Sequence, residues 1–255
     1  MRLKDKVVVV TGATKGIGRG IAEMAAKEGA SVMITGRNIE EGEALVKELK
    51  NDGCRAEFFR ADISKPKECY ALIDKTIEIY GRIDGLVNNA GIFPYYSILD
   101  CPEETFDNVI ATNAKGPFFT TQRALKYMVA QKSGSIVNVG STHWDVGSKL
   151  LSAYAVSKGA LHTMSRHVAL HHARDFIRSN FITVGWVLSP GEIHQRVELD
   201  GEDFEALKKR ASEHIPLGRN QTPEDIAYAC VYLLSDEAEQ VTDTDIKVNG
   251  GIHVP

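Results

Sequence analysis

Short apolar runs alternate with longer amphipathic segments along the whole chain, and this alternation restricts the fold more than any other feature. The runs are rich in β-branched residues, and several are apolar at consecutive positions, which indicates strands covered on both faces. Strands separated by helical segments form βαβ units, whose strands are parallel. The sequence therefore predicts a doubly wound, seven-stranded parallel sheet with helices on both faces. The expected strands are Val7–Thr11, Ser31–Thr35, Ala56–Arg60, Gly85–Asn88, Ser135–Val139, Arg178–Thr183 and Asp245–Val248.

Helix-boundary signals occur between these runs. Residues Ile17–Gly29 are expected to form a helix that ends at Gly29, because glycine is favoured at the left-handed position after a helix. Thr222-Pro223-Glu224-Asp225 predicts another helix start, with a hydroxyl N-cap and two acids facing the positive end of the helix dipole. No linker, low-complexity segment or repeat interrupts the chain, so residues 1–255 are predicted to form one domain.

Charge and composition exclude several classes of protein. A net charge of −4 gives no general attraction to nucleic acid or to an anionic membrane surface. No stretch approaches the roughly 20 apolar residues of a membrane span, and residues 1–6 carry no apolar signal segment, so we expect a cytoplasmic protein. The cysteines have neither metal-ligand nor redox-motif spacing and are expected to be reduced thiols. They are Cys54, Cys69, Cys101 and Cys230.

A glycine-rich segment, Thr11–Gly18, follows the first predicted strand directly, and it reads T-G-A-T-K-G-I-G. Glycines permit a tight turn and a close approach of the backbone to a pyrophosphate. The helix that follows directs its free N–H groups and the positive end of its dipole toward the phosphates. This context predicts a dinucleotide site. The loop residues assigned to it are Gly12, Thr14, Lys15, Gly16, Ile17 and Gly18.

The end of the second predicted strand bears on the choice of dinucleotide. An NAD site usually has a carboxylate there that binds the ribose 2′-hydroxyl. This chain has Gly36 followed by Arg37, so no acid would repel a 2′-phosphate, and a guanidinium is present to bind one. Lys15 in the glycine loop adds a second positive charge. We therefore predict NADP(H); the alternatives are that Arg37 is solvated and that NAD is also accepted.

Tyr154 and Lys158 have the spacing of neighbours on one face of a helix. Hydride transfer to a ketone creates an alkoxide that needs a proton, and a phenol with an ordinary pKa of about 10 is a poor base in the reverse direction. A nearby ammonium favours the phenolate, so Lys158 is expected to lower the pKa of Tyr154. Such a pair occurs often by chance on an exposed helix. Ser141 ends an apolar strand thirteen positions before Tyr154 and is expected to donate a hydrogen bond to the substrate oxygen.

The glycine spacing G-x-x-x-G-x-G, together with Ser141, Tyr154 and Lys158, resembles the short-chain dehydrogenase/reductase family in its short single-domain form, over nearly all of the chain. The resemblance implies a Rossmann-like fold and a reversible hydride transfer between NADP(H) and a ketone or secondary alcohol. It also implies that Lys158 holds the nicotinamide ribose. Asn113, in the segment Ala111–Gly116, would carry a proton relay through a water near Lys158. The pairing of Lys15 with a basic residue after the second strand implies NADP(H) in similar members.

Further cofactor contacts are implied by the same resemblance. Asp62 would take the exocyclic amine of adenine, and small residues in an N-N-A-G turn would let the backbone pass close to the cofactor. The loop after the sixth strand departs from the family pattern, because Val184 replaces the usual proline and changes the freedom of the backbone there. The additional residues carried over are Asp62, Ile63, Asn89, Ala90, Gly91, Gly185 and Val187.

Substrate identity depends on loops, and residues 188–216 are expected to form a short lid. Aromatic and histidine side chains near the site suit a sugar, a polyol or another small carbonyl compound, and they would equally suit packing. The candidates are Phe93, Tyr95, Tyr96, His143, Trp144, Trp186, His194 and Arg196. The resemblance implies a homodimer or homotetramer. Leu161, Met164 and Val168 suit such an interface and equally an internal core.

Four other functions are weaker hypotheses. His167 and His171 could share a zinc ion, but the segment lacks the glutamate of H-E-x-x-H, and we predict no metal. Ser141 has His143 nearby, but no G-x-S-x-G elbow supports a nucleophilic serine. A nucleotide-sugar epimerase or dehydratase would need a larger carboxyl-terminal region. A non-catalytic, NADP(H)-binding regulatory protein would not require the four polar catalytic candidates.

Overall fold

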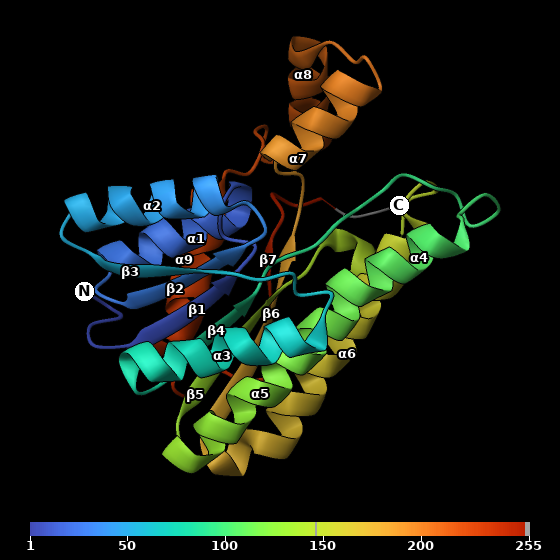
Figure 1. The fold of residues 1–255 in the computed structure, drawn as a ribbon. Coiled ribbons are helices and arrows are strands. Elements are labelled where there is room, and N and C mark those ends of the chain that lie inside the picture. The colour runs from blue at the N-terminus through green and yellow to red at the C-terminus, as the bar shows by residue number, and fades with distance from the viewer. Residues whose placement is uncertain (146, 253–255) are drawn as a thin grey trace.

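The seven strands of the described chain form one parallel sheet, as predicted (Figure 1). The computed structural model describes residues 1–145 and 147–252. Strand boundaries agree with the prediction to within one residue. From one edge to the other, the order is β3 (Arg55–Arg60), β2 (Ser31–Gly36), β1 (Val7–Thr11), β4 (Gly85–Asn88), β5 (Gly134–Val139), β6 (Ile177–Val184) and β7 (Asp245–Val248).

Helices cover both faces of this sheet (Figure 1). One layer contains α1 (Gly16–Lys27), α2 (Ile39–Asn51) and α9 (Pro223–Leu234). The other contains α3 (Pro66–Tyr80), α5 (Gly116–Gln131) and α6 (Ser152–His172). A π-helical turn, Ala111–Lys115, joins α4 (Glu103–Ile110) to α5 without a break. After β6 the chain forms α7 (Pro190–Ile193), a second π turn at His194–Leu199, and α8 (Phe204–His214), which lie above the sheet in Figure 1.

The pattern of apolar residues in β1 explains the two layers. Val8 and Val10 are fully buried in the core beneath α1 and α9, whereas Val9 is fully buried in the core on the α3 and α5 side. Successive side chains of a strand point to opposite faces, so only a run that is apolar at every position can be covered on both. The continuous valine run of β1 therefore places this strand at the centre of a three-layer structure.

Local signals set the ends of two helices of the first layer. Gly29 adopts a φ of +94° just beyond α1, and its N–H bonds to Ala26 O at 2.9 Å, as expected for the glycine that follows a helix. At the start of α9, Thr222 and Asp225 form a reciprocal capping box, and the Asp225 carboxylate accepts from Thr222 N at 2.9 Å. The predicted helix start, with Thr222 as the N-cap and Pro223 as the first helical residue, is confirmed.

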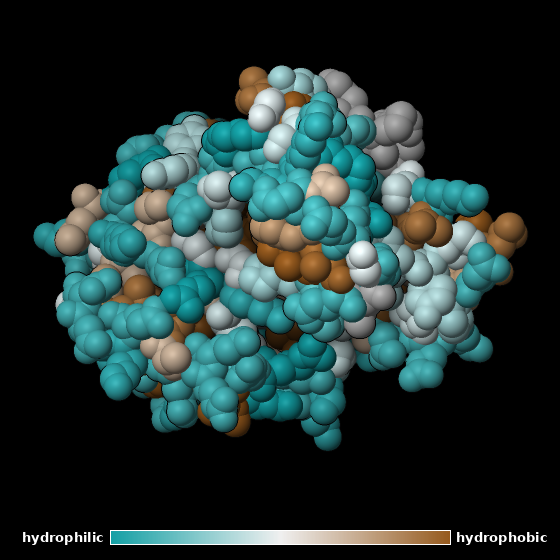
Figure 2. Space-filling view, turned by 90° about the horizontal axis from the view of Figure 1, so that it is seen from above, coloured by the Kyte–Doolittle hydropathy of each residue, from teal (hydrophilic) through white to brown (hydrophobic). Residues whose placement is uncertain are grey.

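The sheet order reverses its direction between β1 and β4. Connections from β1 run outward through β2 to β3, and those from β4 run the other way to β7. The loops at the carboxyl ends of β1 and β4 therefore diverge and leave a crevice between them, which is where open α/β sheets bind ligands. Viewed from the side on which α7 and α8 lie, the surface is hollowed near its middle, with hydrophobic residues inside a largely hydrophilic rim (Figure 2).

Candidate active site

Close backbone packing makes glycine necessary at two positions of the loop after β1. Gly12 has a φ of +64°, and a Cβ there would lie 2.8 Å from Ala90 Cα. A Cβ on Gly18 would lie 2.2 Å from Gly12 O. The Asn89 side chain then fastens the turn after β4 to this loop, because its Nδ2 donates to Thr11 O at 2.9 Å and to Gly12 O at 3.1 Å. The two loops thus form one cradle, joined by hydrogen bonds, at the carboxyl ends of β1 and β4.

The cradle opens into a crevice of about 610 Å³ at the carboxyl edge of the sheet. Its wall includes all the residues that the sequence assigned to a cofactor. The glycines carry no side chain that would stand between the loop backbone and a ligand, and the first turn of α1 has no side-chain cap on its N–H groups. The cradle therefore fits a dinucleotide pyrophosphate. The lining residues from the prediction are Gly12, Thr14, Lys15, Gly16, Ile17, Gly18, Arg37, Asp62, Ile63, Asn89, Ala90, Gly91, Tyr154, Lys158, Gly185 and Val187.

Three charged side chains lie at the end of the crevice beyond β2 and β3. Lys15 and Arg37 are both exposed and line it. Asp62 accepts hydrogen bonds from Ser64 Oγ at 2.7 Å and from Ser64 N at 3.1 Å. Burial opposes ionisation of Asp62, but the bonds from Ser64 and the charges of Lys65 and Arg37 lower its pKa below the ordinary value. This end of the crevice thus combines two cations with one carboxylate acceptor.

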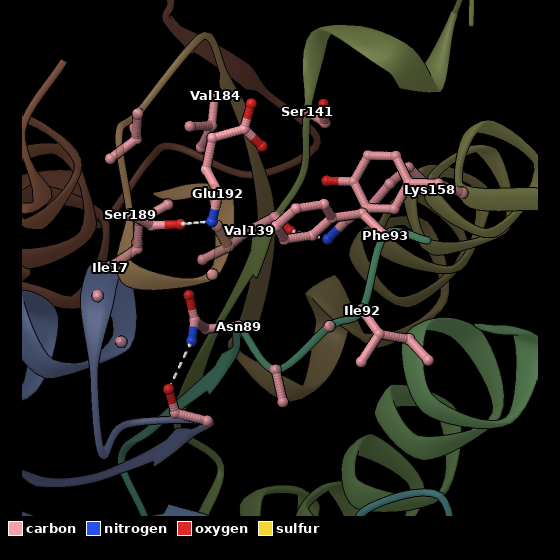
Figure 3. Close-up of a pocket in the computed structure, with 18 of the residues that line it drawn as sticks. Ile17, Asn89, Ile92, Phe93, Val139, Ser141, Lys158, Val184, Ser189 and Glu192 are labelled. Atoms are coloured by element: carbon pink, nitrogen blue, oxygen red, sulfur yellow. Dashed lines mark hydrogen bonds between the residues drawn. The ribbon is translucent and has the colours of Figure 1, made fainter. Parts of the chain in front are cut away.

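Helix α6 brings Tyr154 and Lys158 to the opposite end of the crevice, beside the end of β5. Lys158 is only 4% exposed, and its Nζ donates to Val139 O at 2.7 Å (Figure 3). The same Nζ lies 5.5 Å from the centre of the Tyr154 ring. Ser141, two residues beyond β5, hydrogen-bonds the Tyr154 hydroxyl and also accepts from His143 N at 3.2 Å. A phenol, an ammonium and a hydroxyl therefore converge on one part of the crevice.

The expected lowering of the Tyr154 pKa by Lys158 is wrong for this structure. Burial raises the pKa of Tyr154 to about 12, against an opposing effect of the Ser141 hydrogen bond and with a further increase from Glu192. Burial also lowers the pKa of Lys158 to about 8. Loss of solvation disfavours both charges, and Lys158 lies beside the ring with its N–H directed at Val139 O. Tyr154 is consequently a protonated donor at neutral pH.

Asn113 lies behind the crevice rather than on its wall. Its side chain is 1% exposed and is held by three hydrogen bonds. Oδ1 accepts from Ile92 N at 2.8 Å, and Nδ2 donates to Ile92 O at 2.8 Å and to Ser157 Oγ at 3.0 Å. Both amide hydrogens are therefore used to join the loop after β4 to α6. The side-chain amide therefore braces the site. A proton relay at Asn113 would have to use an atom other than Nδ2.

The loop after β6 forms the back of the crevice. Val184 is the last residue of β6, in register with Val248, so the valine in place of proline continues the strand pairing. Gly185 N donates to Val248 O at 3.1 Å, and a Cβ on Gly185 would lie 2.7 Å from Asn249 Cα. Val187 is buried and pairs with Gln221. Close packing against the chain after β7 thus shapes this loop.

The structure divides the substrate candidates into two groups. Those on the wall of the crevice are Phe93, Tyr95, His143, Trp186 and Arg196. Away from it are Tyr96, Trp144 and His194. Trp144 stacks on His162 with ring centres 3.8 Å apart and donates from Nε1 to Thr183 Oγ1 at 3.1 Å, so it packs behind the site.

Sequence reasoning missed Glu192 and His214, which also line the crevice. Glu192 lies within residues 188–216, the segment that the sequence predicts to be a lid. An isolated glutamate in a polar segment carries no sign that it will be buried. Glu192 is buried through the position of α7 above the sheet, which local sequence does not predict.

Other predicted features are located away from the crevice. His167 and His171 are exposed on α6 with ring centres 4.4 Å apart, and no group of three or more metal-binding side chains occurs in residues 1–145 and 147–252. None of the helices in the described chain has the length and apolar character needed to span a membrane. Leu161 and Val168 are buried within the chain itself, so they belong to its own core rather than to an interface.

Comparisons with known proteins identify relatives that match nearly the whole chain. The family model described as enoyl-(acyl carrier protein) reductase matches residues 12–253. An uncharacterized oxidoreductase of Thermotoga maritima is 39% identical over 98% of both chains. The NADP-dependent (R)-specific alcohol dehydrogenase of Lentilactobacillus kefiri is 37% identical, covering 98% of this chain and 97% of its own. The crystal structure of levodione reductase superimposes with a TM-score of 0.94 at 31% identity over 98% of both chains.

Proposed function

The chain belongs to the short-chain dehydrogenase/reductase family, and we propose that it interconverts a ketone and a secondary alcohol with NADP(H), using Tyr154 to give or take the proton. As a member of this family it is an NAD(P)-dependent oxidoreductase that acts on an alcohol or carbonyl carbon. One observation carries the finer proposal: a single crevice joins the glycine cradle to the cluster of Tyr154, Lys158 and Ser141.

The proposed mechanism divides the work between the cofactor and the chain. When bound, the nicotinamide supplies or accepts a hydride. Ser141 donates a hydrogen bond to the substrate oxygen and shares the charge that develops there. Tyr154, with a pKa of about 12, is protonated at neutral pH and gives its proton to the developing alkoxide, which is the stronger base. Lys158 stabilises the phenolate that remains, and Asn113 holds the loop and α6 in register.

Substituting Tyr154 tests this mechanism. Tyr154→Phe removes the proton donor but keeps the ring that packs edge-on against Phe93 at 6.0 Å. We expect NADPH-linked turnover to fall by about a hundredfold or more, with little change in NADPH affinity measured by fluorescence titration. A variant that retains turnover would refute the role of Tyr154. Loss of NADPH binding in the variant would instead indicate a cofactor-holding role only.

The choice of NADP(H) over NAD(H) is supported by the cations at the adenosine end of the crevice. Lys15 and Arg37 line it, and no acid occupies the end of β2. A guanidinium can bind the 2′-phosphate with paired hydrogen bonds. We propose that Asp62 takes the adenine amine beside it. Comparing kcat/KM for NADPH and NADH tests the preference, and a tenfold preference for NADH would contradict it.

We further propose that residues 1–255 act as one domain in which residues 188–216 form a lid over the substrate. In support, α7 lines the crevice through Glu192, and His214 reaches the crevice from the end of α8.

A homodimer or homotetramer is proposed as well, since Phe106 on α4, Phe118 on α5 and Val156 on α6 are 41 to 55% exposed. Light scattering coupled to gel filtration would test the oligomer, and a monomer at micromolar concentration would contradict it.

A further inference from the structure

A buried carboxylate lies on the wall of the crevice, and the proposed mechanism does not use it. Glu192, in α7, is 8% exposed. Its Oε1 accepts from Trp186 Nε1 at 3.2 Å, and the Tyr95 hydroxyl donates to Oε2 at 3.1 Å and to Oε1 at 3.3 Å. Arg196 Nε lies 3.5 Å from Oε1. Three side chains from three separate segments therefore hold one carboxylate in place.

The arginine of this cluster is fixed as well. The Arg196 guanidinium lies over the Tyr95 ring, 4.3 Å from its centre, and its charge balances that of Glu192. Burial and the charge of Glu192 raise the pKa of Tyr95, so its hydroxyl stays protonated and remains a donor to the carboxylate. The cluster is thus neutral as a whole. Its unused hydrogen-bonding capacity is an acceptor on the Glu192 carboxylate and a donor at Arg196 Nε.

Glu192 faces the region where the substrate would react. In Figure 3 its carboxylate and the Ser141 side chain project into the same part of the crevice. Its charge is close enough to raise the pKa of Tyr154. Phe93 closes this region on another side, edge-on to the Tyr154 ring. A molecule whose carbonyl oxygen contacts Ser141 and Tyr154 would therefore present its neighbouring atoms to Glu192.

The acceptor capacity of Glu192 indicates what those atoms should be. A carboxylate offers about four lone-pair sites. Oε1 accepts from Trp186 Nε1 and shares the single hydrogen of the Tyr95 hydroxyl with Oε2, which has no other donor among the described residues. Arg196 Nε, 3.5 Å from Oε1, makes no hydrogen bond to a described residue. An O–H group of the substrate would supply the missing donor. A substrate carboxylate or phosphate has no such hydrogen and would add a second anion beside a carboxylate that Arg196 already neutralises, while an alkyl group would leave the acceptor unsatisfied.

We propose that Glu192 is a specificity-determining residue that selects a ketone or secondary alcohol bearing a neutral hydroxyl group near the reacting carbon, and that it selects against carboxylates. The substrate class is then a hydroxyketone, polyol or sugar rather than an oxo acid. This inference rests on the proposed hydride transfer at Tyr154. It assigns recognition of the substrate hydroxyl group to the cluster of Glu192, Tyr95 and Arg196.

The test compares ketones that share one skeleton: butan-2-one, 1-hydroxybutan-2-one, 4-hydroxybutan-2-one and 2-oxobutanoate. The readout is kcat/KM for each with NADPH. Because a hydrogen bond to a charged group contributes enough for about a tenfold effect or more, we expect at least one hydroxyketone to exceed butan-2-one by about tenfold. We expect 2-oxobutanoate to be poorer than both hydroxyketones. Equal rates for hydroxyketones and butan-2-one, or a preference for 2-oxobutanoate, would overturn the inference.

Substitution of Glu192 then ties the preference to this side chain. In Glu192→Gln, the ratio of kcat/KM between the better hydroxyketone and butan-2-one should fall about tenfold, chiefly through KM for the hydroxyketone. If Glu192 served only in folding, its loss would lower kcat/KM for both substrates by the same factor and leave their ratio unchanged. That result would also refute the inference. Glu198→Gln is the matched control, because Glu198 lies on the same segment with its side chain 63% exposed, and its ratio should equal that of the wild type.

Two further results separate the possible failures. If Glu192→Gln does not fold, Glu192→Asp keeps the charge beside Arg196 but withdraws it from the crevice, and the ratio should again fall. An unchanged ratio in a folded Glu192→Asp protein would count against the inference. If the wild type reduces none of the four ketones with NADPH or NADH, the proposed function itself fails on these substrates, whereas turnover without hydroxyl preference refutes only the assignment of Glu192.

Discussion

Burial of the Lys158 amine should make the free energy of unfolding depend on pH. Its pKa is lowered by burial from the ordinary value of 10.5 to about 8. At about 1.4 kcal/mol for each pH unit between the two values, keeping this amine charged in the folded protein costs about 3 kcal/mol at pH 7. Replacing Lys158 with methionine, which has a similar length and no charge, removes this cost together with the hydrogen bond to Val139 O.

The pH dependence isolates the electrostatic part. In the unfolded chain the amine keeps its proton up to about pH 10.5, whereas the folded protein releases it above about pH 8. Between these values the unfolded state binds more protons, so the free energy of unfolding of the wild type should rise with pH. Lys158→Met lacks this rise. Measured from pH 7 to pH 10, the wild type should therefore gain about 2.5 kcal/mol relative to the variant.

Urea unfolding at pH 7 and pH 10, at one protein concentration, measures the four free energies needed. Groups that titrate alike in both proteins cancel from the difference. Lys47→Met is the matched control, because Lys47 is exposed on α2 and its loss should leave the pH dependence unchanged. A constant difference between wild type and Lys158→Met across this range would refute the reasoning, since it would mean that the folded protein does not depress the pKa of Lys158.

Three other predictions follow from the crevice. Arg37→Asp should shift the kcat/KM ratio of NADPH to NADH toward NADH by about tenfold or more, and an unchanged ratio would exclude contact between Arg37 and a 2′-phosphate. Gly18→Ala should abolish cofactor binding in fluorescence titration, because the new Cβ would lie 2.2 Å from a backbone oxygen. The control Gly159→Ala, whose new Cβ would lie 3.4 Å from the nearest atom, should bind the cofactor normally. Ketone reduction should decline as pH rises through about 8, where Lys158 loses its charge, and a flat profile to pH 10 would contradict this.

The fold and the cofactor end of the crevice follow from local sequence. The consecutive valines of β1 require cover on both faces, and Gly12 and Gly18 allow backbone contacts that any side chain would block. These are properties of single residues and near neighbours, so periodicity and spacing predict them. The placement of Tyr154 and Lys158 on one helix face was predictable for the same reason.

Tertiary structure alone decided the electrostatics and the substrate side. The pKa values of Tyr154 and Lys158 depend on how much solvent the surrounding layers exclude, and spacing along α6 contains no information about that. Glu192 meets Tyr95 and Trp186 only because α7 folds back over the end of β6 toward the loop after β4. Periodicity describes neighbours within one element, whereas burial depends on the packing of whole layers and the contact between Glu192 and Tyr95 joins residues 97 positions apart.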